Sequence, residues 1–152
     1  MTPEENLKGL GIELPAAPMP VGAYVPVRRS GDLLFISGML PFKDRKLCKT
    51  GKVDNDVSLE EAEECARLSV INALAALKAY LGELEKVKGC IKVTGYIASS
   101  EGFHAQPVVL NAASELLYEV FGEAGRHSRS AVGVPVLPLN SPVEIEFIFE
   151  VE

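Results

Sequence analysis

Hydrophobic side chains recur at helical spacing in three segments of the chain. The longest begins at Ser58, where the capping box Ser58-Leu59-Glu60-Glu61 predicts the first turn of a helix that ends near Gly82. Its inward face carries side chains three or four positions apart: Ala62, Cys65, Ala66, Ser69, Val70, Ala73, Leu74 and Leu77. A second helix is expected over residues 107–121, and Thr2-Pro3-Glu4-Glu5 predicts a short leading helix that reaches about Leu10.

Alternating hydrophobic and polar positions predict strands elsewhere. Residues 25–29 and 33–37 are expected to form a hairpin around Ser30-Gly31-Asp32, and residues 90–98 a further strand. Residues 129–136 and 143–147 also alternate, and Phe149 and Val151 continue the last pattern. Two prolines and an Asn-Ser pair lie between these two segments, which predicts a turn joining neighbouring antiparallel strands. Residues 14–26 hold four prolines and predict an extended arm, whereas residues 41–56 predict a loop with a weak strand near 47–49.

The order of these elements indicates an α+β fold, in which two helices pack on one face of a mixed sheet. The chain supplies no third layer for the other face, so oligomerisation is the simplest way to cover it. With 152 residues, of which 47% are hydrophobic, residues 1–152 are expected to form a single domain. Residues 1–20 provide its N-terminal helix and extended arm.

Charge and hydropathy narrow the function classes. The net charge of −6 and the pI near 5.0 disfavour a phosphate-binding surface, so nucleic acid is not an expected partner. The sequence has no apolar run of membrane-spanning length and no basic region followed by an apolar stretch at its start. We therefore expect a cytoplasmic protein without a membrane partner.

The cysteines and histidines do not indicate a metal centre. Cys48, Cys65 and Cys90 are odd in number and widely spaced, and we interpret them as reduced thiols. His104 and His127 supply no paired ligand set for zinc, so neither a metal nor a cofactor is expected.

The strand over residues 129–136 has two unlike faces. Val132, Val134 and Val136 form a bulky face that suits packing on helices. The other face is nearly bare and leaves room for a ligand beside one guanidinium: Arg129, Ala131, Gly133 and Pro135. Arginine offers a planar fork of donors that matches a carboxylate, although an exposed arginine in a surface ion pair fits the pattern equally well.

The next strand adds two acids. If it pairs with the strand of Arg129, Glu144 or Glu146 comes near the small-residue face. Such an acid can be a counter-ion, or it can hold a water for attack on a bound molecule. His127 shares the face of Arg129 if the strand begins there, whereas a helix-to-strand turn at His127 is just as compatible with the sequence.

Five motifs occur in order from about residue 20 to the C-terminus. They are Gly22-Ala23-Tyr24, Phe35-Ile36-Ser37-Gly38-Met39-Leu40-Pro41, Asn111 as the opening of a helix, Arg129-Ser130-Ala131-Val132, and Leu137-Pro138 followed by Val143-Glu144-Ile145-Glu146. Together they resemble the Rid family of reactive-intermediate deaminases, also called the YjgF type and formerly endoribonuclease L-PSP.

The resemblance implies a chorismate-mutase-like fold, assembled as a homotrimeric barrel with sites between subunits. It also implies hydrolysis of reactive enamines and imines to 2-keto acids and ammonia, without a cofactor. Arg129 would bind the substrate carboxylate, Glu144 would orient or activate the water, and Tyr24 would close the pocket. Ser37, Gly38, Asn111 and Ala131 would line it. A non-catalytic binder of small carboxylates such as keto acids is the alternative, and an endoribonuclease is the least supported.

Two positions depart from the family pattern. Ala131 stands where many members carry cysteine, which argues against thiol chemistry, and Met39 replaces the usual glutamine. The leading helix, the longer loop after Pro41 and the Gly125-Arg126-His127 segment are additions. These differences indicate a divergent branch whose substrate can differ from simple imino acids.

Overall fold

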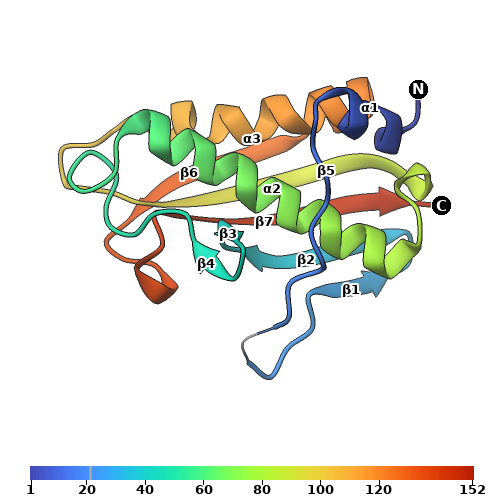
Figure 1. Cartoon of the computed structure of the whole chain (residues 1–152), viewed down its shortest axis with the longest axis horizontal. Helices are drawn as coiled ribbons and strands as arrows, with labels where there is room; N and C mark the ends of the chain where they lie inside the picture. Colours follow the sequence, from blue (N-terminus) through green and yellow to red (C-terminus); the bar gives the residue numbers. More distant parts are fainter. Residues whose placement is uncertain (21) are drawn as a thin grey trace.

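A computed structural model describes residues 1–20 and 22–152 of the chain. Its centre is a five-stranded mixed sheet in the order β1-β2-β7-β5-β6 (Figure 1). The strands are β1 (Val27–Ser30), β2 (Leu33–Met39), β5 (Val87–Ala98), β6 (Ser128–Val134) and β7 (Val143–Val151). The predicted hairpin is confirmed, with Gly31 in its turn at a φ of 59°, and the predicted weak strand is part of a two-stranded hairpin, β3 (Phe42–Lys43) and β4 (Lys46–Leu47).

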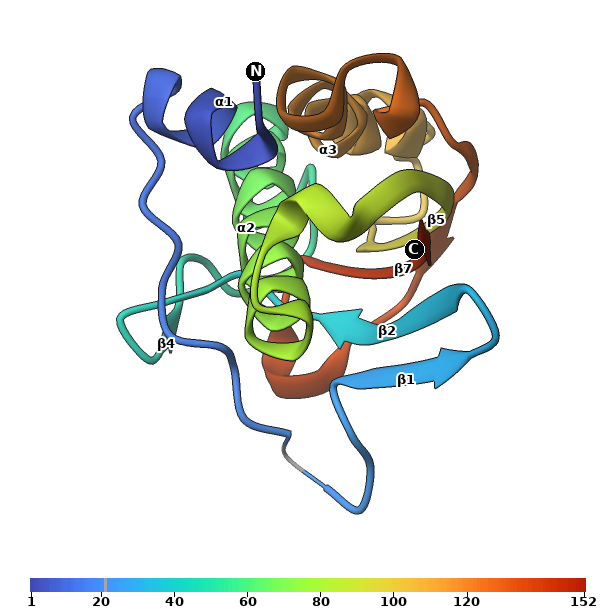
Figure 2. The same ribbon diagram turned by 90° about the vertical axis from the view of Figure 1, so that its right-hand side faces the viewer.

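Three helices lie on one side of this sheet, and no described helix lies over the opposite face (Figures 1 and 2). They are α1 (Pro3–Gly9), α2 (Leu59–Leu81) and α3 (Gln106–Phe121), and short 3-10 turns cover Leu84–Lys86, Gly122–Gly125 and Pro138–Asn140. Both predicted capping boxes are present, at Thr2 and at Ser58, and Gly82 ends α2 with a φ of 88°. The mixed α+β architecture with two long helices on one face is therefore confirmed.

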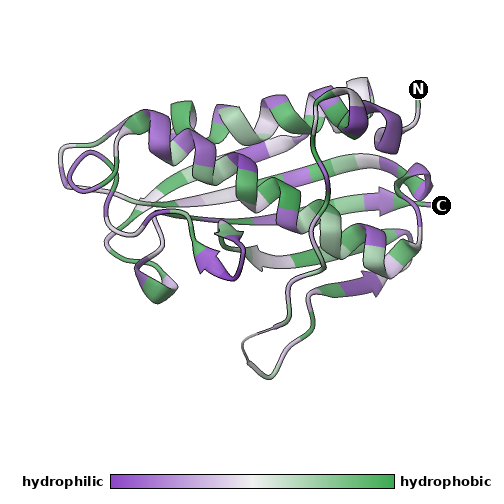
Figure 3. Ribbon diagram, in the orientation of Figure 1, coloured by the Kyte–Doolittle hydropathy of each residue, from purple (hydrophilic) through white to green (hydrophobic). Residues whose placement is uncertain are grey.

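Hydrophobic burial follows the predicted faces of α2 and of the last strand. Green and purple bands alternate along α2 and α3, as expected for helices with one face on a sheet (Figure 3). Alternate residues of β7 are buried beneath the helices: Val143, Ile145, Phe147, Phe149 and Val151. No helix of the described residues has the length and apolar character needed to cross a bilayer.

The pairing expected for the last two strands is wrong. The edge strand β6 runs parallel to β5, whereas β7 lies antiparallel between β2 and β5. The physical reason is the crossover through α3, which returns the chain beside β5 in the same direction, as a strand-helix-strand unit does. The connection over residues 135–142 then carries the chain past β5, so it is not a hairpin turn.

The assignment of the two faces of β6 is also wrong. Its small-residue face lies against α3, while Val132 on the other face is 42% exposed. Close approach of the helix explains the small residues: a Cβ at Gly133 would lie 2.7 Å from Gln106 Nε2. On the neighbouring strand, a Cβ at Gly95 would lie 2.5 Å from Leu110 Cδ1. The bare face therefore makes room for a helix of the same chain.

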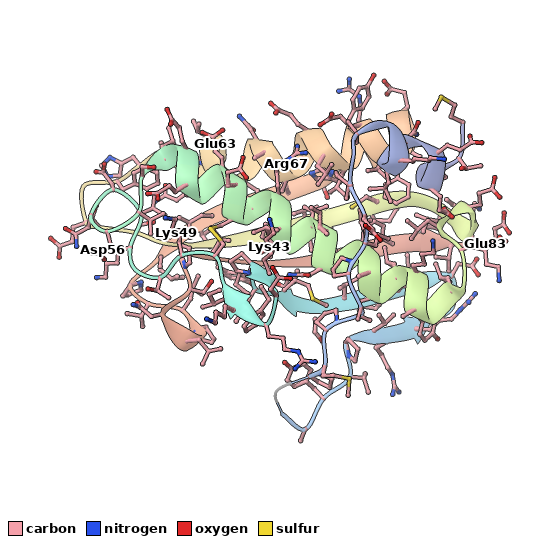
Figure 4. All side chains as sticks on the ribbon, in the orientation of Figure 1. Lys43, Lys49, Asp56, Glu63, Arg67 and Glu83 are labelled. Carbon is pink, nitrogen blue, oxygen red and sulfur yellow. A yellow bond between two sulfur atoms is a disulfide. The ribbon has the colours of Figure 1, made fainter. Side chains whose placement is uncertain are left out.

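Two of the three cysteines are not reduced thiols. Cys48, just after β4, forms a disulfide with Cys65 in α2 across a Cα–Cα distance of 6.6 Å (Figure 4). The loop after Pro41 folds onto the first turns of α2, and this contact could not be inferred from cysteine spacing alone. Cys90 is free, as expected, and burial raises the pKa of its thiol to about 12.

Candidate functional site

The predicted site residues divide between two pockets of the single chain. Four of them line one pocket of about 290 Å³: Tyr24, Ser37, Gly38 and Glu144. Two others, Arg129 and Asn111, line a second and more open pocket of about 610 Å³. A third groove of about 640 Å³ between α1, the N-terminal arm and α2 contains none of the predicted residues.

The first pocket, which we call the Glu144 pocket, depends on the absence of a side chain at Gly38. A Cβ at this position would collide with the Glu144 carboxylate. Gly38 lies within the irregularity between Ile36 and Met39, where the pairing of β2 with β7 shifts register. The glycine therefore lets the carboxylate lie against the β2 backbone.

The structure distinguishes Glu144 from Glu146. Both project from β7 on the face away from the helices, but Glu144 is half-buried and lines the pocket, whereas Glu146 is exposed and does not. Burial, assisted by the negative charge of Glu146, raises the pKa of Glu144 above its ordinary value. Glu146 instead accepts a hydrogen bond from the hydroxyl of Tyr96 at 2.8 Å, which raises the pKa of that tyrosine.

Ser37 connects the pocket to the extended arm. Its hydroxyl donates to the Val25 carbonyl at 2.7 Å, and its backbone N–H donates to the Pro26 carbonyl at 3.0 Å. Tyr24 precedes these acceptors and is half exposed at the pocket. Ser37 thus holds the segment that carries Tyr24. Val21, within the expected arm, lies outside the described residues.

The second pocket, the Arg129 pocket, lies where the start of β6 meets α3. Arg129 Nη1 donates to Ser114 Oγ at 3.1 Å, and Nη2 donates to the Pro107 carbonyl at 3.3 Å. Asn111 lines the same pocket, but it does not open α3 as expected, because the helix begins five residues earlier at Gln106. A guanidinium with donors still available beside an open cavity can bind a carboxylate.

Within one chain the two pockets do not meet. Glu144 projects from the open face of the sheet, whereas Arg129 lies on the helix-covered face at the far edge, beyond β5. The expectation that the acid approaches the small-residue face is therefore wrong for a single chain, because β7 is not the neighbour of β6. Ala131 lines neither pocket and packs against the hydrophobic core.

Ser114 is a site residue that the sequence prediction missed. It lies three positions after Asn111, on the same side of α3, and contacts both Arg129 and His127. The helical spacing from Asn111 was the available signal. The described residues contain no group of three or more His, Cys, Asp or Glu that could hold a metal ion.

Comparisons with known proteins show which family the sequence resembles. The model of a family described as "YjgF/chorismate mutase-like, putative endoribonuclease" matches residues 4–151. "Protein TCP17" of Trypanosoma cruzi is 40% identical over 146 residues, which are 95% of this chain and 91% of that protein. A 2-iminobutanoate/2-iminopropanoate deaminase of Dermatophagoides farinae is 27% identical over 93% of this chain and 95% of that enzyme.

Solved structures share the fold. The crystal structure of Atu1372 from Agrobacterium tumefaciens, a protein of unknown function, has a TM-score of 0.93 and 44% identity, covering 99% of this chain and 92% of that one. E. coli TdcF with bound serine has a TM-score of 0.66 and 25% identity, covering 90% of this chain and 93% of that one. Because the family model matches residues 4–151, which are nearly the whole chain, the chain belongs to the YjgF/chorismate mutase-like family.

Proposed function

We propose that this protein hydrolyses 2-imino acids, or their enamine tautomers, to 2-keto acids and ammonia. The observation that carries the proposal is the Glu144 carboxylate, which is half-buried, has a raised pKa and lies in a pocket beside Gly38. A half-buried carboxylate that lines a pocket and has a raised pKa suits a general base that holds a water. The relative from Dermatophagoides farinae is named a 2-iminobutanoate/2-iminopropanoate deaminase, which supports the choice of reaction.

In the proposed reaction, Glu144 holds a water against the imine carbon. Water adds to the C=N bond, and one of its protons passes by way of the carboxylate to nitrogen, which gives a carbinolamine. The hydroxyl proton of the carbinolamine then passes to the amine in the same way, and the C–N bond breaks to release ammonia as the C=O bond forms. Arg129 binds the substrate carboxylate through the donors that its own chain does not use. TdcF with bound serine supports a small ligand that carries a carboxylate.

The proposal requires a second copy of the chain, because the two pockets lie apart in one. The open face of the sheet favours such an assembly: Phe35 and Val132 are 41% and 42% exposed there, and Ile148 pairs with Phe35. Apolar side chains on an uncovered sheet face are typical of an interface. We therefore propose a homotrimer in which the Glu144 pocket of one copy faces the Arg129 pocket of another, and light scattering should give about three times the 16.3 kDa chain mass.

A coupled assay tests the activity. An amino-acid dehydratase generates the imine from serine or threonine, and this protein should accelerate release of the keto acid over a blank without it. Arg129→Lys keeps the charge but loses the planar fork, so kcat/KM should fall by about 10²-fold while circular dichroism is unchanged. Keto-acid binding without acceleration would instead identify a non-catalytic binder, and RNA cleavage that Arg129→Lys leaves intact would identify a ribonuclease.

A mixing experiment tests the site between copies. Arg129→Lys and Glu144→Gln assemblies should each be nearly inactive, but dissociating and reassembling them together should restore part of the activity. Mixed assemblies contain sites in which a wild-type Glu144 faces a wild-type Arg129 from another copy. If mixing restores nothing while the mixed assemblies form, the site does not lie between copies.

A further inference from the structure

A continuous line of hydrogen bonds lies behind Arg129 in its pocket. His127 Nδ1 is 2.7 Å from the Gly125 carbonyl oxygen, and His127 Nε2 is 2.9 Å from Ser114 Oγ. Ser114 Oγ in turn lies 3.1 Å from Arg129 Nη1. The line therefore joins the turn before β6, the middle of α3 and the first residues of β6.

The direction of each hydrogen bond follows from the two groups at the ends of the line, one of which can only accept and the other only donate. A carbonyl oxygen only accepts, so His127 carries its proton on Nδ1 and donates to Gly125. In the neutral ring, Nε2 is then an acceptor, so the Ser114 hydroxyl donates its proton to Nε2. A guanidinium only donates, so Ser114 Oγ accepts from Arg129 with its lone pairs. With His127 neutral, only one placement of the protons therefore forms all three hydrogen bonds.

The surroundings favour this neutral arrangement. Burial lowers the pKa of His127 below its ordinary value, and the charge of Arg129 lowers it further, although the bond to Gly125 opposes them. Packing fixes the Gly125 carbonyl, since a Cβ at Gly125 would collide with the Leu117 carbonyl oxygen of α3. The Gly125 end of the line is therefore held against α3.

We infer that Ser114 and His127 are positioning residues, which fix the Arg129 guanidinium in one orientation so that its remaining donors meet a carboxylate in the pocket. Only the identity of the ligand, a 2-imino or 2-keto acid, rests on the proposed function. Ser114 and Pro107 together occupy one donor on each terminal nitrogen of Arg129. The second donor of each nitrogen and the Nε–H remain for the two oxygens of a carboxylate.

The same serine and histidine resemble a nucleophile and its base, but the contacts favour positioning. Ser114 lies within the helix α3, whose neighbouring backbone N–H groups bond along the helix and cannot form an oxyanion hole. Its oxygen also already accepts from Arg129. If Ser114 becomes acylated by p-nitrophenyl acetate, the positioning role is wrong.

The direct test observes Arg129 itself. In low-temperature ¹H–¹⁵N spectra, the Nη1–H signal of Arg129, which bonds Ser114 and is assigned by its loss in Arg129→Lys, should be sharp and protected from exchange in the wild type. Ser114→Ala and His127→Phe should broaden it or speed its exchange, whereas Ser114→Thr, which retains the hydroxyl, should preserve it. The ¹⁵N shifts of His127 should show a neutral ring protonated at Nδ1.

A binding measurement gives the functional consequence. Calorimetric titration with pyruvate should show an affinity about tenfold weaker in Ser114→Ala and His127→Phe than in the wild type, because a mobile guanidinium must be ordered by its ligand. In the imine assay the same variants should raise KM more than they lower kcat. His104→Gln is the matched control, since His104 is exposed and lines neither the Glu144 nor the Arg129 pocket.

The two proposals can fail separately. If the Arg129 signal is equally ordered in the wild type, Ser114→Ala and His127→Phe, the positioning role of Ser114 and His127 is wrong even if the protein hydrolyses imines. If the signal loses order in the variants but the wild type hydrolyses no imine, only the deaminase is rejected.

Discussion

The backbone around Glu144 makes room for its carboxylate, whereas the guanidinium of Arg129 is held in place by hydrogen bonds to neighbouring groups. Gly38 lets the carboxylate lie against β2, and Ser37 fastens the arm beside it through backbone carbonyls. Arg129, in contrast, is oriented by the side chain of Ser114 and by the Pro107 carbonyl of α3. The position of the Glu144 carboxylate therefore depends on the shape of the backbone, and that of the Arg129 guanidinium depends on hydrogen bonds.

The two regions also differ in what supports them. The hairpin of β3 and β4 supplies Phe42 to the Glu144 pocket and is fastened to α2 by Asn72, which donates to the Leu40 and Phe42 carbonyls at 3.0 Å each. The Cys48–Cys65 disulfide fastens the same loop. The Arg129 pocket is built instead on α3 and the start of β6, with no cysteine among its lining residues.

The largest expected effect is on stability and comes from the disulfide. Closing a loop of 17 residues restricts the unfolded chain, so Cys48→Ser should lower the free energy of unfolding by about 3 kcal/mol under oxidising conditions. Chemical denaturation with and without reductant measures the difference. The reductant should affect the wild type and leave Cys48→Ser unchanged, and equal stability of the oxidised and reduced wild type would refute the stabilising role.

Removing the charge of Glu144 should have the next largest effect. If this carboxylate activates the water, Glu144→Gln should slow imine hydrolysis by roughly 10²-fold and leave pyruvate affinity nearly unchanged, because Arg129 binds the carboxylate. Glu146→Gln is the matched control, since Glu146 bonds Tyr96 outside the pocket. A wild-type rate for Glu144→Gln together with a slow Glu146→Gln would transfer the role to Glu146.

Gly38→Ala should show how much imine hydrolysis depends on the position of the Glu144 carboxylate when its charge is kept. Gly38→Ala places a Cβ against the Glu144 carboxylate, which is the flexible end of its side chain and can move aside. We expect imine hydrolysis about tenfold slower, as for a misplaced base, with little change in the unfolding midpoint. A crystal structure of the variant should show the carboxylate displaced and Arg129 unmoved. Gly102→Ala, where a Cβ meets nothing within 4 Å, is the control.

The sequence predicted the elements better than their arrangement. Ser58 and Thr2 define helix starts through local hydrogen bonds, so capping boxes could be recognised from four residues. Strand order depends on where a connection leads, and the prolines after Val134 fit a hairpin turn and a crossing connection equally well. The small residues Ala131 and Gly133 likewise fit a ligand or a closely packed helix, and only the structure shows the helix.

The candidate site shows the same limit. Glu144 and Arg129 were named from motifs, but their opposite sheet faces follow from the pairing register, and their separation across β5 follows from strand order. Neither could be predicted from the sequence. Ser114 is one ordinary helix residue in the sequence, and its importance arises from the neighbours that α3 and β6 bring to it. The sequence pattern therefore predicts which residues belong to the candidate site, but the contacts that each side chain makes follow only from the three-dimensional fold.

The smallest expected effect is the pH dependence of stability, and it has opposite signs in the two pockets. The pKa of His127 is lowered by folding, so its contribution is present above about 6.5 and is lost as the pH falls from there toward its folded pKa. The pKa of Glu144 is raised by folding, so its contribution is present below its ordinary value of 4.5 and is lost as the pH rises through its folded pKa. Urea denaturation from pH 8 to pH 4 should therefore show that His127→Gln weakens the loss of stability on acidification, while Glu144→Gln raises stability at neutral pH. If the free energy of unfolding of both variants changes with pH in parallel with that of the wild type, folding does not shift the pKa of either His127 or Glu144 as described.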